Sequence, residues 1–337
     1  MIGFFILPKT CKPLFLGLFR RISTSGPPWS VIFFGSDNFA LSSLQMLHKE
    51  LKTGEHIKSL SVVCAYMKCP VAQYSLKNKI NIIPWKPQKN QLQGADVGFV
   101  VSFGHLIPQS IISSFPLGMV NVHASLLPRW RGAAPIIHTV LNAETETGVT
   151  LMKIRPHRFD CGEIIGSSKL KIGPQEDAET LTRRLANLGS AELQSCLKSL
   201  TERLGQAKPQ TETGVSYAPK VDASMSCCKW AEMTASQLHR RHLALHHVFP
   251  LHADWHGQTV KFLECAPMEK TSSSAPGFVD FSKKHRHLEV TCNKQSVLTV
   301  NQLKLSGKKV MSAMDFVNGF LKKVPVDLWK FGNGECG

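Results

Sequence analysis

The fold is decided by residues 30–51, S-V-I-F-F-G-S-D-N-F-A-L-S-S-L-Q-M-L-H-K-E-L. Residues 30–34 are a short apolar run that predicts a buried β-strand, and Gly35 predicts the turn that follows it. From Asn38 onward, apolar residues recur at intervals of three and four, which is the spacing of an α-helix with one buried face. A strand, a tight turn and a helix in this order are the repeating unit of an α/β domain.

The same alternation continues to about residue 204. Val- and Ile-rich runs are separated by amphipathic or loop segments and lie at 60–66, 80–83, 96–103, 118–122 and 148–154. Continuous apolar strands of this kind are typical of a parallel sheet that is covered on both faces. Asp177 is placed to cap a long helix over about 178–203 that closes the unit. We therefore predict a doubly wound, Rossmann-like α/β domain over residues 30–204.

The pattern changes after this domain. Residues 205–217 are polar, contain Gly and Pro and show no periodicity, so they predict a linker. After a helix at about 235–247, short β-like segments follow at 258–264, 277–281, 287–291 and 297–305, and Ser312 with Asp315 resembles the capping box of a last helix. Short strands at close spacing favour a small β-barrel, of the oligonucleotide-binding (OB) type, over residues 218–330.

The charge of the chain is strongly positive. There are 40 Lys and Arg residues against 24 Asp and Glu, a formal net charge of +16 over 337 residues. Residues 218–337 hold 16 basic and 10 acidic residues. Such a surplus suits a polyanionic partner such as nucleic acid, or a targeting sequence, although a solvated charged surface is the simpler interpretation of any one cluster.

The N-terminus is consistent with such a targeting sequence. Residues 1–29 contain no carboxylate, since the first is Asp37, and basic residues alternate with apolar ones before R-I-S-T-S-G-P-P. This pattern favours a mitochondrial transit peptide and a location in the mitochondrial matrix. A secretory signal is the alternative, but Lys12 and the pair Arg20 and Arg21 interrupt its apolar run. No apolar run approaches 18 residues, so no membrane span is predicted.

Polar residues gather in the stretch V-N-V-H-A-S-L-L-P-R-W-R-G-A-A-P, residues 120–135. Asn121, His123 and Ser125 are spaced two apart at the end of a predicted strand, so their side chains point to the same side. One interpretation is a hydrogen-bonded corner between strand and loop. The other is a cleft, because doubly wound sheets bind ligands at the carboxyl ends of their strands.

A carboxylate follows the next predicted strand, in R-F-D-C-G-E at 158–163. Asn121 could donate to a developing oxyanion, and His123 could relay a proton or orient a partner. Asp160 could accept a hydrogen bond from His123 or raise the basicity of an amine. Ser125 lacks the G-x-S-x-G setting of a hydrolase nucleophile, and Gly35 alone is no dinucleotide fingerprint. The cysteines form no Cys-x-x-Cys pair, so no metal site is predicted.

These motifs carry a resemblance to a known family. N-V-H-A-S-L-L-P-R-W-R-G-A-A-P, with G-V-T-L-M-K-I (148–154), F-D-C-G-E behind it and Y-A-P-K at 217–220, resembles the folate-dependent formyltransferases over about residues 30–320. Within that family the chain is most similar to the mitochondrial enzymes that act on methionyl-tRNA.

The resemblance implies the roles of the site residues. Asn121, His123 and Asp160 match the family's catalytic trio, and its tetrahydrofolate-binding signature falls on Ser125, Leu126, Leu127 and Pro128. The implied reaction moves the formyl group of 10-formyltetrahydrofolate, a co-substrate, to the α-amino group of methionyl-tRNA, with no metal. Partners would be these two substrates, and we expect a monomer without membrane attachment.

Some implications stay open. Arg129 and Arg131 flank Trp130 where the tRNA 3′ end would arrive, and they could bind phosphate or stabilise the loop. In bacterial members a Gly/Lys-rich loop enters the acceptor stem of the tRNA, and the matching region 66–80 is shorter here. How the protein would distinguish initiator from elongator methionyl-tRNA is therefore left open by the sequence. The alternatives are formylation of a small amine, for which a basic second domain is unnecessary, and a nucleic-acid-binding protein on a degenerate enzyme fold, against which the intact trio argues.

Overall fold

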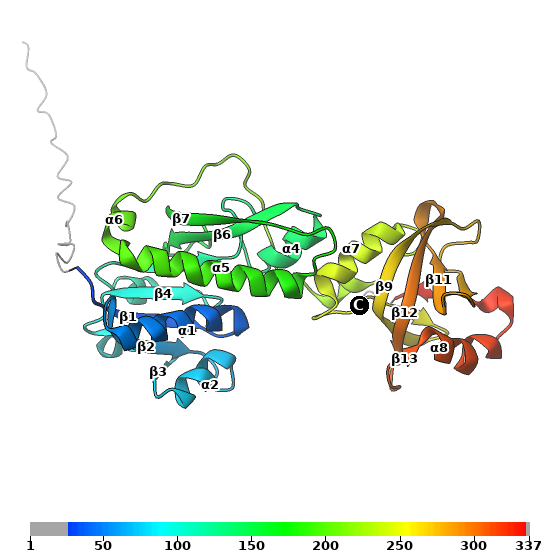
Figure 1. The fold of residues 1–337 in the computed structure, drawn as a ribbon, viewed down its shortest axis with the longest axis horizontal. Coiled ribbons are helices and arrows are strands. Elements are labelled where there is room, and N and C mark those ends of the chain that lie inside the picture. The colour runs from blue at the N-terminus through cyan, green and yellow to red at the C-terminus, as the bar shows by residue number, and fades with distance from the viewer. Residues whose placement is uncertain (1–25, 335–337) are drawn as a thin grey trace, which may run out of the picture.

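The structure is a computed structural model that describes residues 26–334, and it contains two domains side by side along its long axis (Figure 1). The predicted transit peptide lies outside the described residues except for its last four. Trp29, the last of these, begins the first strand, is 1% exposed and donates from its indole Nε1 to the carbonyl of Leu197 (3.4 Å).

The N-terminal domain alternates strands and helices, as the sequence predicts. Its elements are β1 (Trp29–Gly35), α1 (Asn38–Thr53), β2 (Ile57–Cys64), α2 (Pro70–Lys77), β3 (Asn81–Pro84), η1 (Lys89–Leu92), β4 (Val97–Val101), α3 (Gln109–Ile112), β5 (Met119–His123), α4 (Pro135–Leu141), β6 (Glu146–Lys153), β7 (Ile164–Lys171), α5 (Ala178–Lys198) and α6 (Leu200–Gly205). The predicted long helix breaks at Ser199, and the Asp177 cap is confirmed by a hydrogen bond from Thr180 N (2.7 Å).

The strands form one sheet in the order β3-β2-β1-β4-β5-β6-β7. The first five strands are parallel, which confirms the Rossmann-like prediction, but β6 runs antiparallel to both of its neighbours, β5 and β7. The parallel prediction was therefore wrong for residues 148–154. The reason is that β6 forms a hairpin with β7, a strand the sequence did not predict because its buried and exposed positions alternate instead of forming an apolar run.

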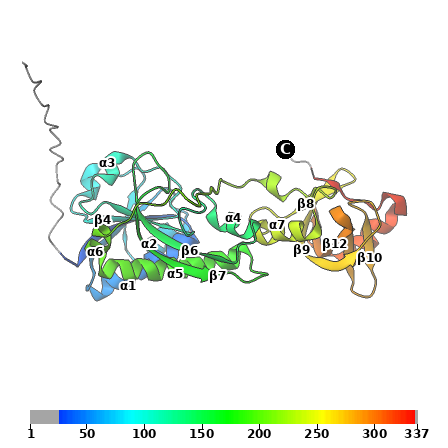
Figure 2. The same cartoon turned by 90° about the horizontal axis from the view of Figure 1, so that it is seen from above.

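Helices cover both faces of the sheet (Figure 2). The larger apolar core lies between the sheet and the helices α1 and α5, with Leu44 and Leu185 fully buried. On the other face a smaller core around Phe34 and Phe115 is covered by η1 and α3. The doubly wound arrangement leaves the carboxyl ends of the parallel strands at one edge of the sheet.

The C-terminal domain is a curled antiparallel sheet in the order β10-β11-β12-β9-β8-β14, with β13 beside β12. Its elements are β8 (His252–Trp255), β9 (Gln258–Thr271), β10 (Val279–Ser282), β11 (His287–Thr291), β12 (Ser296–Leu305), β13 (Met311–Ser312), α8 (Ala313–Gly319) and β14 (Gly332–Asn333). Residues 329–331 hydrogen-bond to residues 277–279 and bring the ends of the sheet together, so the predicted barrel-like fold is confirmed. The Ser312–Asp315 capping box is present on α8.

The helix α7 (Ala235–Leu245) joins the two domains, between α4 and the barrel in Figure 1. Leu243 and Leu245 are buried in the core of the N-terminal domain, whereas Ala235 and Leu238 are buried in the core of the barrel. The chain between α6 and α7 begins with residues 206–218, which we call the connecting segment. It runs back along the N-terminal domain and pairs with it, since the backbones of Lys208 and Ile164 exchange two hydrogen bonds (2.8 and 2.9 Å).

None of the helices in residues 26–334 combines the length and the apolar character that crossing a bilayer requires.

Candidate active site

The structure brings two of the three predicted catalytic residues together at the edge of the sheet. His123 is the last residue of β5, and Asp160 lies in the loop between β6 and β7. The distance from His123 Nδ1 to Asp160 Oδ1 is 3.6 Å, and both side chains are largely buried, 6% and 12% exposed. This distance is too long for a hydrogen bond, but it is short enough for the two groups to interact electrostatically in a site that water reaches poorly.

The orientation of His123 is set by the loop after β5. Its Nε2 lies 2.9 Å from the carbonyl oxygen of Trp130. Because a carbonyl can only accept, Nε2 carries a proton and donates it there. The ring atom that remains to take up or release a proton is Nδ1, which faces Asp160.

Asp160 is held in an unusual backbone conformation. Its φ is +52°, in the left-handed region that residues with a Cβ seldom adopt. Its Oδ2 accepts a hydrogen bond from Gly132 N (2.8 Å). Two residues on, a Cβ at Gly162 would lie 1.6 Å from the carbonyl oxygen of Lys153, so only glycine fits there.

An ion pair closes the base of the same loop. Arg155 donates to Glu163, and this hydrogen bond and charge hold the pKa of the Glu163 carboxyl below its usual value. The loop that carries Asp160 is therefore fastened at both ends.

Asn121 lies two residues before His123 on the same side of β5. Its neighbours across the sheet are Val100 on β4 and Met152 on β6. The side chain is half-buried, and its amide makes no hydrogen bond to any residue in the described part of the chain. An amide in this position is available to donate to a substrate oxygen.

The predicted folate signature forms a tight turn. Ser125 is fully buried and its hydroxyl donates to the carbonyl of Arg129 (2.6 Å). Thr150 Oγ1 on β6 donates to Ser125 O (2.7 Å) and accepts from Leu127 N (3.1 Å). The Ser125 hydroxyl therefore closes the turn, while Leu126 and Pro128 are partly exposed.

The two arginines predicted at the mouth of the site differ in their surroundings. The side chain of Arg129 is 49% exposed, pairs with Glu144 and lies over the Trp130 ring, 5.0 Å from its centroid. Arg131 is 9% exposed, and its Nε (3.0 Å) and Nη2 (2.7 Å) both donate to Gln210 Oε1. These contacts favour the loop-stabilising alternative for Arg131, whereas Arg129 retains an exposed cation.

Sequence reasoning missed Gln210, which lies in the predicted linker. A single glutamine among polar residues carries no pattern, and its partners are 48 to 79 positions away along the chain. It also missed Thr150, which looks like any strand residue and whose hydroxyl is only seen to hold the turn once β5 and β6 are paired.

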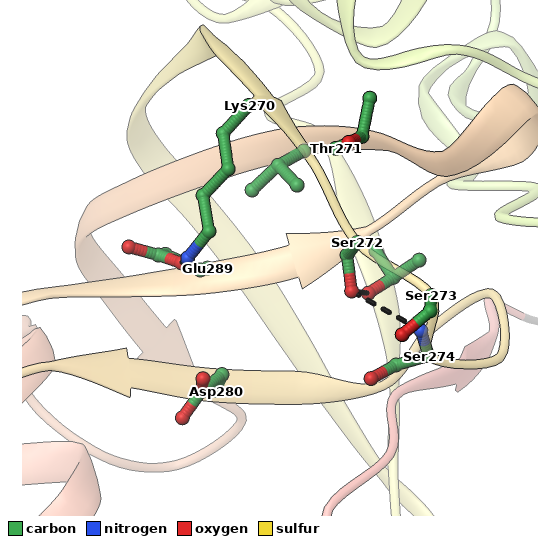
Figure 3. Close-up of a pocket in the computed structure, with 9 residues that line it drawn as sticks. Lys270, Thr271, Ser272, Ser273, Ser274, Asp280 and Glu289 are labelled. Atoms are coloured by element: carbon green, nitrogen blue, oxygen red, sulfur yellow. Dashed lines mark hydrogen bonds and ion pairs between the residues drawn. The ribbon is translucent and has the colours of Figure 1, made fainter.

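A separate hollow of about 180 Å³ lies in the C-terminal domain (Figure 3). It is lined by Lys270, Thr271, Ser272, Ser273, Ser274, Asp280, Glu289, Thr291 and Val297. The charge of Lys270 is already paired with Glu289 inside it, and no predicted catalytic residue contributes to its wall. The sheet edge at His123 is therefore kept as the candidate active site. Within residues 26–334, no three His, Cys, Asp or Glu side chains are grouped so as to hold a metal ion.

The chain matches two family descriptions over most of its length. Residues 30–197 match Formyl transferase, and residues 220–321 match Formyl transferase, C-terminal domain. The first match contains the His123–Asp160 site, and the second contains α7 and most of the barrel.

Curated relatives are similar across both domains. The mitochondrial methionyl-tRNA formyltransferase of Mus musculus is 41% identical over 310 residues, which cover 88% of this chain and 79% of the relative. The Homo sapiens protein of the same name is 39% identical over 88% of this chain and 78% of its own length. The methionyl-tRNA formyltransferase of Hahella chejuensis is 29% identical over 87% of this chain and 94% of its own.

Solved structures share the fold at lower identity. WlaRD, a sugar 3N-formyl transferase, has a TM-score of 0.58 at 19% identity and covers 84% of this chain and 100% of its own. HypX from Aquifex aeolicus has a TM-score of 0.59 at 16% identity and covers 88% of this chain and 48% of its own. With 39–41% identity to the mammalian enzymes over nearly nine-tenths of its length, the chain belongs to the formyltransferase family, in the branch of the methionyl-tRNA formyltransferases.

Proposed function

We propose that the chain transfers the formyl group of 10-formyltetrahydrofolate to the α-amino group of methionine on methionyl-tRNA, for initiation of mitochondrial translation. The observation that carries the proposal is the arrangement of Asn121, His123 and Asp160 at one sheet edge, in a chain similar to methionyl-tRNA formyltransferases over both domains. We place the protein in the mitochondrial matrix, on the mitochondrial location named for the mammalian relatives and the basic N-terminal sequence.

The residues at the site fit a formyl-folate donor. The Asn121 amide has no partner among the described residues, and it lies on the strand that leads into the turn of Leu126 and Pro128. WlaRD, which has the same fold, is described in the presence of 5-N-formyl-THF. When bound, the donor would supply an activated formyl group and depart as tetrahydrofolate, with a proton added at N10.

Asn121 serves the carbonyl oxygen of the formyl group. As the amine adds to the formyl carbon, negative charge develops on that oxygen, and a fixed N–H donor stabilises the charge in the transition state. Asn121 needs no rearrangement to do so because its amide is not engaged elsewhere in residues 26–334.

His123 and Asp160 serve the protons. The attacking amine must lose a proton when the new C–N bond forms, and the folate nitrogen must gain one when the old C–N bond breaks. His123 Nδ1 takes up and returns this proton, and the Asp160 carboxylate at 3.6 Å stabilises the imidazolium in between. Trp130 O, by holding Nε2, keeps the ring from turning away.

The test is a formyl-transfer assay with radiolabelled donor and three acceptors: charged initiator methionyl-tRNA, charged elongator methionyl-tRNA, and a small amino sugar. Rapid labelling of the initiator tRNA, strongly slowed in Asn121→Ala, supports the proposal. The reaction with the amino sugar tests the alternative function, formylation of a small amine, because a sugar formyltransferase has the same fold. Faster labelling of the sugar than of either tRNA would overturn the choice of acceptor.

A further inference from the structure

The connecting segment carries a side chain that contacts both loops of the active site. Gln210 uses every hydrogen-bonding group of its amide. Its Oε1 accepts from Arg131 Nε (3.0 Å) and Nη2 (2.7 Å), and its Nε2 donates to the carbonyl oxygens of Asp160 and Gly162 (both 2.9 Å). An amide with one oxygen and two N–H groups has no further capacity, so these contacts fix its position.

The contacts to Asp160 and Gly162 act on a backbone that needs support. Asp160 has a φ of +52°, a strained conformation for a residue with a Cβ, which persists only where the surrounding contacts hold it. Gln210 holds the carbonyl oxygens on both sides of the Asp160–Cys161–Gly162 segment. This orientation of the backbone directs the Asp160 side chain toward His123.

The contact to Arg131 connects Gln210 to the other loop. Three consecutive residues of this loop each make one hydrogen bond at the site. The carbonyl of Trp130 accepts from His123, and the N–H of Gly132 donates to Asp160. Between them, the guanidinium of Arg131 donates to Gln210. Arg131 is nearly buried and pairs with no carboxylate in the described residues. The neutral Oε1 of Gln210 accepts its hydrogen bonds where a carboxylate would be expected.

The connecting segment continues to hold this loop beyond Gln210. Arg131 N donates to Ser216 O (2.9 Å), and Ala218 N donates to Arg131 O (2.7 Å). A Cβ at Gly132 would lie 2.6 Å from the carbonyl of Ala218, so the two backbones are in close contact. The connecting segment therefore packs against the active-site loop, and Gln210 is the side chain through which it contacts the backbone of Asp160.

We propose that Gln210 is a positioning residue for formyl transfer, which acts by holding the Asp160 backbone so that the carboxylate faces His123. The inference rests on the proposed function, because it assigns Asp160 a part in that reaction. Gln210 itself touches no reacting atom in this arrangement. Its loss should therefore slow the chemical step and leave the binding of both substrates nearly unchanged.

The variant that tests this is Gln210→Glu. A glutamate keeps the oxygen that Arg131 binds, so the contact between segment and loop survives, but it places a second oxygen against the carbonyls of Asp160 and Gly162. We expect kcat to fall by about 10²-fold, a loss of the size that misplacing a catalytic group by about 1 Å can cause. KM for methionyl-tRNA and for the formyl donor should stay close to the wild-type values, and the thermal melt should stay close to that of the wild type.

The matched control is Gln206→Glu. Gln206 lies in the same segment and is exposed, and its hydrogen bonds within residues 26–334 are to Glu202, so this variant makes the same charge change away from the site. It should be as active as the wild type. Gln210→Ala, which removes the hydrogen bonds to both loops, should lower kcat as well and should also lower the melting temperature.

Two results would overturn the proposal: a Gln210→Glu variant with wild-type kcat, or a loss of activity fully accounted for by the unfolded fraction. If the unchanged kcat came with a raised KM for tRNA, Gln210 would be a substrate contact instead. A wild-type protein that does not formylate methionyl-tRNA refutes the proposed function instead, whereas an active wild type with an equally active Gln210→Glu refutes only the role of Gln210.

Discussion

The active-site edge and the C-terminal barrel are built in different ways. Around Asp160, functional atoms are held by hydrogen bonds between segments 28 to 79 residues apart in the chain. The barrel is held by an aromatic core in which Trp255, Phe262, Phe316 and Phe331 pack against one another. Several of its exposed basic side chains lie in hairpin turns outside that core.

This difference predicts two kinds of mutational response. At the edge, removing one hydrogen bond or charge moves or disables a group that must be accurately placed, so kcat should change by orders of magnitude. On the barrel surface, each lysine contributes one of many similar electrostatic interactions, so single changes should alter binding slightly and leave kcat alone. The predictions that follow run from the first kind to the second.

The largest effect is expected for Asp160→Asn. The amide keeps the shape of the carboxyl but removes the negative charge that stabilises a protonated His123, so transfer should fall by about 10³–10⁴-fold. Single-turnover kinetics measures this, and a circular-dichroism melt on the same sample checks the fold. If the variant melts far below the wild type and the unfolded fraction explains the loss, Asp160 is a structural residue.

A smaller loss is expected for Asn121→Ala. Removing one oxyanion donor should lower kcat by about 10²–10³-fold with little change in folate binding. The measurement is kcat together with the affinity for a folate analogue. Asn90→Ala, at an exposed asparagine on η1, serves as the control. Near-normal turnover in folded Asn121→Ala would show that another group binds the oxygen.

The sequence predicted most of this fold because apolar runs and caps are local signals. The central strands and α1 follow from periodicity, and Asn121 and His123 share a side because strands have a period of two. β7 was missed because Gly166 and Ser167 interrupt its apolar residues and its lysines face outward. The pairing of residues 329–331 with 277–279, which brings the barrel ends together, has no local signature either.

The site was only partly predictable, because some of its contacts have no local signal in the sequence. We expected the contact between His123 and Asp160 because the carboxyl ends of parallel strands meet at one edge of a sheet. The contact is present, but β6 is antiparallel to β5 and ends beside Val120, so the loop after β6 has to return to bring Asp160 to His123. The support of Asp160 by Gln210 could not be expected, because it depends on where a polar segment without periodicity returns to the domain. Hydrogen bonds between such segments are set by the completed tertiary structure.

An intermediate effect, on stability, is expected at the junction between the two regions. Asp177 caps α5 and lies near His246 of the following domain, 3.8 Å from Oδ2 to Nε2. Asp177→Ala should lower the free energy of unfolding by about 0.5–2 kcal/mol, the range for removal of an N-cap, and leave kcat unchanged at moderate temperature. Urea unfolding of both proteins near neutral pH measures the difference.

The same cap should make stability depend on pH. Burial opposes ionisation of Asp177, but the N–H of Thr180 and the nearby His246 and His247 outweigh it, so the pKa of this carboxyl lies below its usual value. A lowered pKa stabilises the fold above the unfolded pKa of about 3.9 and loses this contribution as the pH falls below that value. The difference in free energy of unfolding between the wild type and Asp177→Ala should therefore become smaller at acidic pH. If this difference does not change with pH, the charge of Asp177 does not contribute to the stability of the cap.

The smallest effects are expected on the barrel, and truncation cannot measure them. A chain cut near residue 210 would lack Leu243 and Leu245, which complete the core of the N-terminal domain, and also Ser216 and Ala218, which hydrogen-bond to the active-site loop. Point substitutions avoid this. The pairs Lys283 with Lys284 and Lys308 with Lys309 are exposed in the β10–β11 and β12–β13 turns, and within the described residues they have no carboxylate partner.

Replacing both lysines of one pair by glutamine should weaken tRNA binding modestly. Each lysine that binds a phosphate releases counterions, so the slope of log affinity against log salt should decrease by about 1 for each phosphate-binding lysine that is replaced. KM for methionyl-tRNA should rise at low salt, whereas kcat at saturating tRNA and the affinity for folate should stay at wild-type values.

Lys169→Gln is the control, because Lys169 lies on β7 of the other domain and is paired with Glu146 (2.9 Å). If the control and the barrel variants give the same salt slope as the wild type, the basic turns are ordinary solvated surface, and tRNA must be bound through the active-site side of the molecule.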